Sequence, residues 1–293
     1  MNVKDIIDEV TSACCQSGSN RQKQIFAALI KHLYGFVEEV KPSDKEWEAA
    51  IQFLTQAGKM CDDKRQEFIL LSDVLGVTAL KDHLNNVKPK AATEATVLGP
   101  FYRDGVKTYP LGTSISQGIK DGEPCLIKGR VTDLNGSPIA GATIDVWQAA
   151  ENGLYEQQDN AQPEMNLRGC FTTDNEGYYW LETVKPKYYP IPTDGPVGQL
   201  LKKMGRHEYR PAHIHFIVSA EKFEPVITQY FDKACKYIDS DAVFGVKPSL
   251  LVDFVPVKEA TQYKNVSLSA NSWVIACDFV LVNTKEHNDE TMV

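Results

Sequence analysis

The sequence predicts a mixed fold, in which an all-α N-terminal domain (residues 1–95) precedes an antiparallel β-sandwich domain (residues 96–293). Apolar residues recur at helical spacing in the first part of the chain. Beyond it, short runs of β-branched and aromatic residues alternate with Gly, Pro, Asp and Asn, and no helical pattern separates them. Many short strands without intervening helices favour an antiparallel sandwich.

The N-terminal domain is expected to contain three main helical segments. The first carries an apolar stripe and ends at Pro42; the stripe consists of Ile25, Phe26, Leu29, Ile30, Leu33, Phe36, Val37 and Val40. Ser43 and Glu46 form a capping-box pattern at the start of the second, which continues to Ala57. The third is expected to start near Asp63 and to run through QEFILLSDVLGVTALKDHL, until Lys88-Pro89-Lys90 ends the pattern.

The remaining elements read as strands. The first two candidates flank a turn containing Asn135-Gly136, which is typical of hairpins. The strand candidates are residues 125–133, 142–149, 177–184, 213–219, 249–257 and 272–282. Residues 188–198 contain three prolines and two glycines, so we expect an irregular loop there.

Composition excludes several classes of partner. The 293 residues include 31 Lys+Arg and 39 Asp+Glu, which gives a net charge of −8 and argues against nucleic acid or an anionic membrane surface. The start of the chain is acidic and lacks an apolar signal region, and no stretch approaches a membrane span. Seven cysteines without a CxxC pair argue against a disulfide framework and a thiolate zinc site. We therefore expect a cytoplasmic protein.

The most informative segment for chemistry is RPAHIHFIVS. On a strand, His213 and His215 point to the same face and Ile214 to the other, so the two imidazoles could bind one metal ion. A strand HxH is more often a packed pair than a metal site. No acidic residue or cysteine lies at a convenient spacing, but tyrosines are abundant nearby. A phenol with a pKa near 10 ionises easily only at a strongly Lewis-acidic centre, and Fe(III) suits that role better than Zn(II).

Four ordered motifs, NGLY, PKYYPIP, RPAHIH and ITQYF, resemble those of the intradiol catechol dioxygenases, and the similarity extends over essentially the whole chain. The resemblance implies one Fe(III) per subunit, held by Tyr155, Tyr189, His213 and His215. Tyr189 is preferred to its neighbour Tyr188 because it precedes the PIP segment and lies 24 residues before His213 (213 − 189).

The same resemblance assigns catalytic roles. Arg210 would stabilise negative charge that builds on the substrate ring, because its guanidinium stays protonated. Gln229 would orient the substrate, and Tyr189 would be the ligand that leaves when the substrate binds. For Arg210 and Gln229, a structural hydrogen bond to nearby loops is the simpler alternative.

The segments TEATVLGPFY and QEFILLSDVLGV resemble the hydroxyquinol 1,2-dioxygenase branch more than the catechol or chlorocatechol branches. The implied substrate is benzene-1,2,4-triol, which O2 would convert to 3-hydroxy-cis,cis-muconate and maleylacetate. The substrate pocket would consist of Leu70, Asp73, Val97, Leu98, Gly99, Pro100, Phe101, Ile191, Pro192 and Arg210. Asp73 is the exception in an apolar slot, and we hypothesise that it accepts a hydrogen bond from a third ring hydroxyl.

The resemblance also implies a homodimer formed through the N-terminal helices, and a phospholipid at that interface is compatible with it. Ile6, Ile7, Val10 and the apolar stripe over residues 25–40 offer enough surface. Packing of the same helices on the sandwich explains this pattern equally well.

Two other classes of protein compete with the dioxygenase interpretation. The segment GRVTDLNGSPIAGATIDVW also resembles transthyretin-like binding modules, which need no iron. A zinc hydrolase that uses the HxH pair would lack a third ligand and a general base at a useful spacing. Colour separates them, because tyrosinate bound to Fe(III) absorbs visible light.

Overall fold

The computed structural model describes residues 3–14, 18–62, 65–118 and 122–284. The chain forms two compact units, Met1–Met60 and Cys61–Val293. Helices α4 (Glu67–Val74) and α5 (Val77–Asn85) therefore belong to the same unit as the sheets, whereas the sequence prediction placed the domain boundary after residue 95. The predicted helix start near Asp63 lies outside the described residues.

The first unit consists of three helices, α1 (Val3–Cys14), α2 (Asn20–Val40) and α3 (Asp44–Lys59). The capping box expected at Ser43 and Glu46 is confirmed, and Ser19 with Gln22 forms a second one at the start of α2. Neither α1 nor α2 contains a buried residue, and most of the apolar stripe on α2 is exposed. No helix in the described part of the chain has the length and apolar character needed to cross a membrane.

The third predicted helix is two helices in the structure. Gly76 separates α4 from α5 with a left-handed φ of 74°. Helical hydrogen bonding cannot continue through that conformation, so the chain changes direction between the two helices. Glu67, Asp73 and Val74 of α4 are buried in this unit.

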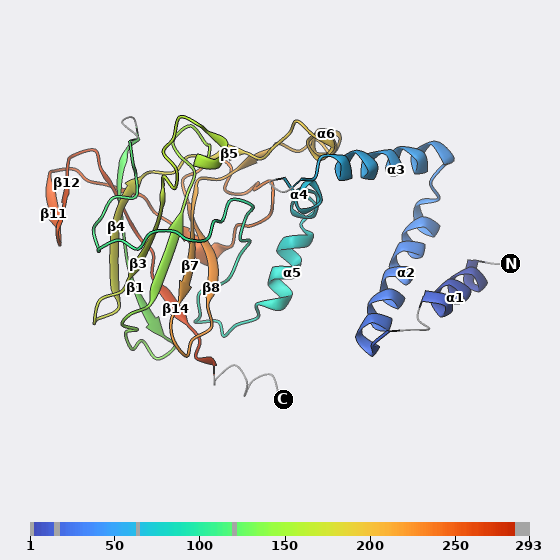
Figure 1. The fold of residues 1–293 in the computed structure, drawn as a ribbon, viewed down its shortest axis with the longest axis horizontal. Coiled ribbons are helices and arrows are strands. Elements are labelled where there is room, and N and C mark those ends of the chain that lie inside the picture. The colour runs from blue at the N-terminus through green and yellow to red at the C-terminus, as the bar shows by residue number, and fades with distance from the viewer. Residues whose placement is uncertain (1–2, 15–17, 63–64, 119–121, 285–293) are drawn as a thin grey trace. The chain divides into compact units, whose positions relative to one another are not determined.

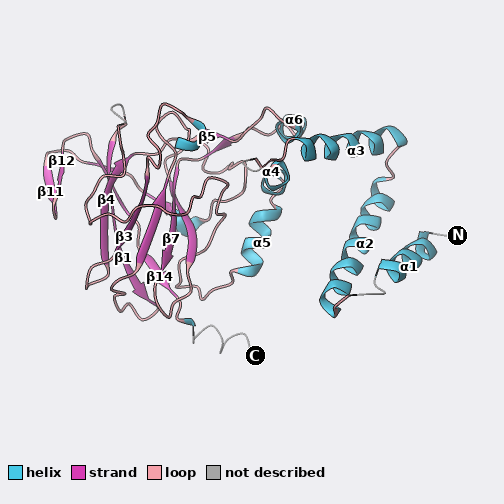
Figure 2. Ribbon diagram, in the orientation of Figure 1, coloured by secondary structure: helices cyan, strands magenta, loops and turns pink. Residues whose placement is uncertain are grey.

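Two five-stranded sheets form the body of the second unit (Figure 1, Figure 2). In the first sheet, β1 (Pro124–Asp133) lies between β4 (Tyr178–Val184) and the C-terminal strands β13 (Trp273–Ala276) and β14 (Phe279–Leu281), and β10 (Val255–Pro256) pairs with β13. The second sheet has the order β3 (Arg168–Thr172), β2 (Thr143–Trp147), β7 (His213–Ser219), β8 (Val226–Asp232) and β9 (Leu251–Val252).

The predicted succession of helices and β-sheets is confirmed, but the sheets are not wholly antiparallel. Strand β1 pairs in parallel with β13 and with β14, and β8 pairs in parallel with β9. The predicted strand over residues 272–282 is broken at Cys277-Asp278, so its two halves pair with successive parts of β1. The turn at Asn135-Gly136 is present, but β1 and β2 enter different sheets and form no hairpin with each other.

Other local predictions were incomplete. Residues 188–198 are not wholly irregular, because Tyr189–Pro190 forms β5, which pairs with β6 (Tyr209–Arg210), and Pro196 begins helix α6 (Pro196–Lys203). Strands β3, β8, β11 (Thr261–Tyr263) and β12 (Val266–Leu268) fall outside the predicted strands. The short helices η1 (Glu156–Gln158) and η2 (Pro248–Leu250) complete the described elements.

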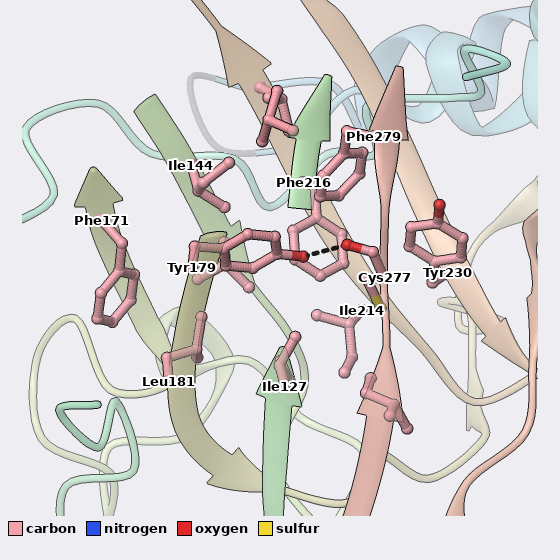
Figure 3. Packing of buried hydrophobic residues seen from close by; sticks show 14 of the residues in the cluster. Ile127, Ile144, Phe171, Tyr179, Leu181, Ile214, Phe216, Tyr230, Cys277 and Phe279 are labelled. Atoms are coloured by element: carbon pink, nitrogen blue, oxygen red, sulfur yellow. Dashed lines mark hydrogen bonds between the residues drawn. The ribbon is translucent and has the colours of Figure 1, made fainter. Parts of the chain in front are cut away.

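The inner faces of the two sheets pack together in one apolar core (Figure 3). Ile214, Phe216 and other apolar residues of the second sheet face Tyr179, Leu181 and Phe279 of the first. Tyr179 is fully buried, and its hydroxyl donates a hydrogen bond of 2.7 Å to the carbonyl of Cys277. Because Ile214 and Phe216 point into this core, the alternate residues of β7 point to the opposite face of the sheet.

Candidate metal centre and substrate pocket

The outer face of the second sheet carries a row of functional side chains. In β7, His213 and His215 alternate with Ile214 and so lie on this face. Trp147 of β2 pairs with His215 on one side, and Gln229 of β8 pairs with it on the other. The indole of Trp147 stacks on the His215 ring, with the centroids 4.7 Å apart. The rigid sheet therefore fixes the position and tilt of both imidazoles.

Both histidines are buried and present Nε2 to the same point. His213 Nδ1 lies 2.7 Å from the carbonyl oxygen of Pro211. A carbonyl only accepts, so Nδ1 carries the proton and Nε2 has a free lone pair. Burial, and then the charge of Arg210, lower the pKa of His213 to about 3, and burial also lowers the pKa of His215 well below its usual value. Two neutral imidazoles are suited to bind a metal ion.

Two tyrosines complete this set. Tyr155 lies at the start of η1 with its ring stacked on Phe101, at a centroid distance of 4.4 Å. Tyr189 lies in β5, directly opposite Arg210 of β6. The neighbouring Tyr188 packs against Tyr209 and Tyr237 instead and is 40% exposed. The structure thus brings Tyr189 to the histidines and turns Tyr188 away.

The four polar atoms form a closed ring. Tyr155 Oη lies 3.1 Å from His215 Nε2, which lies 3.1 Å from His213 Nε2. His213 Nε2 lies 3.3 Å from Tyr189 Oη, and the two phenol oxygens are 3.3 Å apart. Ligands about 2 Å from one ion lie about 3 Å from each other, so this spacing fits a single first-row metal ion.

The chemistry of the set selects the kind of ion. Among residues 3–14, 18–62, 65–118 and 122–284, no three His, Cys, Asp or Glu side chains gather at a metal-binding distance, so the phenol oxygens are the available anionic donors. Burial, followed by the proximity of Tyr189, raises the pKa of Tyr155 well above its usual value. Ionisation of this phenol therefore needs a strongly charged cation, and two phenolates with two imidazoles fit Fe(III) better than Zn(II).

Arg210 adds a fixed positive charge beside the ring of donors. Its Nη1 lies 3.1 Å from His213 Nε2, and its Nη2 donates to Gln229 Oε1 over 2.9 Å. Asp241 accepts from Nε and Nη2 over 3.1 and 3.2 Å. Burial alone would lower the pKa of Arg210, but the charge and hydrogen bonds of Asp241, together with the two nearby tyrosines, raise that pKa above its usual value. The cation is therefore permanent.

A cavity of about 710 Å³ lies beside these groups. Five of the predicted pocket residues line it, namely Leu70, Asp73, Pro100, Phe101 and Pro192. The other predicted residues are not among those that line it. Leu98 packs against the cluster of Trp147, Tyr155 and Tyr189, and a Cβ on Gly99 would lie 3.0 Å from His215 Cε1. The carbonyl of Val97 accepts from the side chain of Gln229, and the buried Ile191 donates its backbone N–H to Glu208.

Asp73 is buried at the wall of the cavity. Burial raises the pKa of this carboxyl, while a hydrogen bond from Thr78 and the charge of Arg210 act in the opposite direction. A buried acceptor at this wall has the chemistry to bind a hydroxyl group.

Several lining and supporting residues escaped the sequence prediction. Arg65, Tyr102, Arg103 and Gln157 also line the cavity. Asp241 holds Arg210 but lies 31 residues further along the chain (241 − 210), outside any of the recognised motifs. A buried carboxylate in a loop belongs to no periodic pattern, so the spacing of residues in the sequence could not identify Asp241.

Comparisons with known proteins agree with this geometry. Residues 97–282 match the family described as "Dioxygenase", and residues 19–93 match that described as "Catechol dioxygenase N terminus". The chain is 51% identical to hydroxyquinol 1,2-dioxygenase of Rhizobium sp. (strain MTP-10005) over 89% of each protein. It is 40% identical to catechol 1,2-dioxygenase of Candida albicans over 85% of this chain and 84% of that protein.

A solved structure is similar as well. The crystal structure of hydroxyquinol 1,2-dioxygenase from Pseudomonas putida DLL-E4 superposes with a TM-score of 0.91 at 42% sequence identity. The match covers 96% of this chain and 98% of that one.

Proposed function

We propose that this chain, which belongs to the intradiol ring-cleavage dioxygenase family, opens hydroxyquinol with O2 to give 3-hydroxy-cis,cis-muconate, the tautomer of maleylacetate. The observation that carries the proposal is the ring of four polar atoms from Tyr155, Tyr189, His213 and His215, with edges of 3.1 to 3.3 Å. The identity of 51% to a hydroxyquinol 1,2-dioxygenase, against 40% to a catechol 1,2-dioxygenase, supports the triol as substrate.

The four side chains would hold one Fe(III) per subunit. The chemistry that Fe(III) supplies when bound is Lewis acidity toward two adjacent ring oxygens and the redox access that allows the ring to react with O2. The histidines suit this role because both are neutral at working pH, and the tautomer of His213 is fixed by Pro211.

The chain's own residues would bind and orient the ring. Leu70, Pro100 and Phe101 form apolar walls for a flat aromatic molecule, and Phe101 is itself held by stacking on Tyr155. Asp73 would accept a hydrogen bond from the third hydroxyl and thereby favour a triol over a diol. The wall residues would also keep bulk water from the reacting edge of the ring.

Proton transfer and charge stabilisation would fall to Tyr189 and Arg210, beside the four donor atoms. Tyr189 Oη would accept a proton from one substrate hydroxyl as the ring binds. Arg210 Nη1, 3.1 Å from His213 Nε2, would donate to the negative charge that develops on the ring and its oxygens. Gln229 would hold the side chain of Arg210 in place, since its Oε1 accepts from Arg210 Nη2 and its Nε2 donates to the carbonyl of Val97.

The exposed apolar surface of the first unit supports a homodimer. On α2 the exposed large side chains are Ile25, Phe26, Leu29, Leu33, Phe36, Val37 and Val40. A surface of this kind is rarely left in water, so a second copy of the chain, with a phospholipid filling any remaining gap, would cover it. Sedimentation of the wild-type protein and of Leu33→Glu tests the dimer: the variant should be monomeric, and equal masses would contradict it.

Oxygen uptake tests the activity. The iron-loaded protein should consume one O2 per hydroxyquinol and should turn over catechol and 4-chlorocatechol with lower kcat/KM. A reddish colour should accompany the activity, because tyrosinate bound to Fe(III) absorbs visible light. A colourless protein that holds zinc, or one without stoichiometric iron, would favour the hydrolase or the transthyretin-like binding module. Faster turnover of catechol would favour a catechol 1,2-dioxygenase.

A further inference from the structure

The guanidinium of Arg210 has an unequal distribution of hydrogen bonds. Its Nε–H and one Nη2–H donate to the two carboxylate oxygens of Asp241, and the other Nη2–H donates to Gln229. Nη1 remains, and it faces His213 Nε2 at 3.1 Å. Three of the five N–H groups thus fix the side chain. The Nη1 edge is directed at the point where the four polar atoms of the centre converge.

Asp241 is itself held rigidly. Its Oδ1 accepts the backbone N–H of Val243 at 3.3 Å, and its Oδ2 accepts that of Gly245 at 2.9 Å. Asp241 is 5% exposed; burial would raise the pKa of its carboxyl, but the charge and hydrogen bonds of Arg210, together with His213 and the backbone N–H of Val243, lower that pKa. A carboxylate fixed by its own loop can aim its partner, because a planar fork-to-fork pair allows one orientation of the guanidinium.

Gly245 leaves space for this arrangement. A Cβ on this residue would lie 2.9 Å from Arg210 Nη2 and 3.2 Å from Asp241 Oδ2. Its backbone shows no left-handed φ, so the constraint is the contact with the guanidinium. The same loop is tied to the segment that leads into the pocket, since the hydroxyl of Thr96 donates to the carbonyl of Gly245 over 2.6 Å.

We propose that Asp241 is a positioning residue, which clamps Arg210 so that its Nη1 edge faces the reacting ring. This role rests on the proposed function. Asp241 acts through Arg210 and does not line the substrate cavity, so it should affect the chemical step more than substrate binding. A guanidinium released from the fork keeps its charge but loses the direction in which that charge acts.

The test is a double-mutant cycle on the iron-loaded protein. Asp241→Asn keeps the shape of the side chain and removes the carboxylate fork, and we expect kcat to fall at least about tenfold while KM changes less than about twofold. In an Arg210→Ala background the same change should have no further effect on kcat, because its target is gone. Iron content and the visible absorption band should match those of wild type in every variant.

Asp232 offers a matched control. It is 6% exposed, lies near Lys185 at 3.6 Å and accepts a backbone N–H; in the described part of the chain, no hydrogen bond or ion pair joins its side chain to Arg210 or to the four donors. Asp232→Asn should therefore keep the kcat of wild type. Gly245→Ala supplies an independent disturbance of the clamp with Asp241 intact, and it should lower kcat in the same way.

Three outcomes would overturn the role of Asp241. The first is an unchanged kcat in Asp241→Asn, and the second is an equal fall in kcat with and without Arg210. The third is a fall in kcat that is proportional to a loss of bound iron. If Asp241→Asn does not fold, Gly245→Ala decides, and a kcat equal to that of wild type would refute the clamp. A wild-type protein that binds iron but opens no catechol-type ring would refute the proposed function, and this role with it.

Discussion

Gly99 lies directly against His215. Its φ is +77°, and a Cβ built on it would be 3.0 Å from His215 Cε1. The segment that enters the pocket therefore touches the edge of an imidazole that we assign to the metal. Glycine is required here both for the backbone conformation and for the contact.

Replacing Gly99 by Ala should weaken metal binding. The left-handed φ costs an alanine about 1 kcal/mol in the free energy of unfolding, and the contact displaces the ring of His215. Gly105→Ala is the control, because its φ is +79° and no atom lies within 4 Å of its Cβ position. Both variants should lose similar stability in chemical denaturation, but only Gly99→Ala should lose iron affinity in a chelator competition. Equal iron affinities would contradict the steric role of Gly99.

The two adjacent tyrosines can be distinguished by absorption. Tyr189→Phe removes a phenol from the centre, so the visible band of the iron-loaded protein should shift or weaken and kcat should fall at least about a hundredfold. Tyr188→Phe should leave the band unchanged, because Tyr188 lies with Tyr209 and Tyr237. A reversed pattern would mean that Tyr188 is the ligand.

The metal-stripped protein should lose stability as the pH falls. The pKa of His213 is lowered to about 3 by burial and then by the charge of Arg210, against 6.5 as its usual value. Between these values the unfolded chain binds a proton that the folded chain does not. The free energy of unfolding should therefore fall by about 1.4 kcal/mol per pH unit for this histidine as the pH drops below 6.5.

The contribution of His213 can be isolated by difference. His213→Gln replaces the imidazole with a side chain that does not titrate in this pH range. The free energy of unfolding of the variant, measured by urea titration between pH 6.5 and pH 4, should therefore depend less steeply on pH than that of the wild type. Parallel curves for the two proteins would exclude the buried neutral state of His213.

Asp73 should recognise the third hydroxyl of the substrate by accepting a hydrogen bond from it. Asp73→Ala removes a buried acceptor at the cavity wall, so kcat/KM for hydroxyquinol should fall at least about tenfold more than kcat/KM for catechol. Leu70→Ala widens the same cavity without removing a polar group and should affect both substrates alike. If Asp73→Ala lowers kcat/KM equally for both substrates, Asp73 has only a structural role.

The core should depend on the hydroxyl of Tyr179. Tyr179→Phe leaves the buried carbonyl of Cys277 without this donor and should reduce the free energy of unfolding by about 1–3 kcal/mol. Tyr178→Phe is the matched control, because that half-buried side chain lies on the opposite face, where its ring contacts Arg130. Similar denaturation midpoints for both variants would show that the hydrogen bond adds little.

The sequence predicted those features that depend on local patterns. Alternation along a strand was sufficient to bring His213 and His215 to one face, and the capping box at Ser43 appears where expected. The choice of Tyr155 and Tyr189 came from the motifs of a family, because 60 and 24 residues separate each from its histidine neighbour. Spacing alone could not have brought them together.

Features that arise from long-range pairing were missed. The parallel pairing of β1 with β13 joins Cys125 to Trp273, and its register depends on the packing of both sheets. The fork between Arg210 and Asp241 likewise depends on tertiary contacts. The periodicity of apolar residues predicts local helices and strands, but it does not predict which distant residue a buried loop residue will contact.

The pairing of β1 with the end of the chain has a consequence for biosynthesis. One edge of β1 stays unpaired until its partners have been synthesised. Residues 125–128 pair with residues 273–276, and residues 131–133 pair with residues 279–281. A ribosome releases these partners long after β1, so the nascent sheet exposes an unpaired strand edge over that interval. Chains that terminate before residue 273 should accordingly aggregate or be degraded, although they contain every residue of the proposed metal centre.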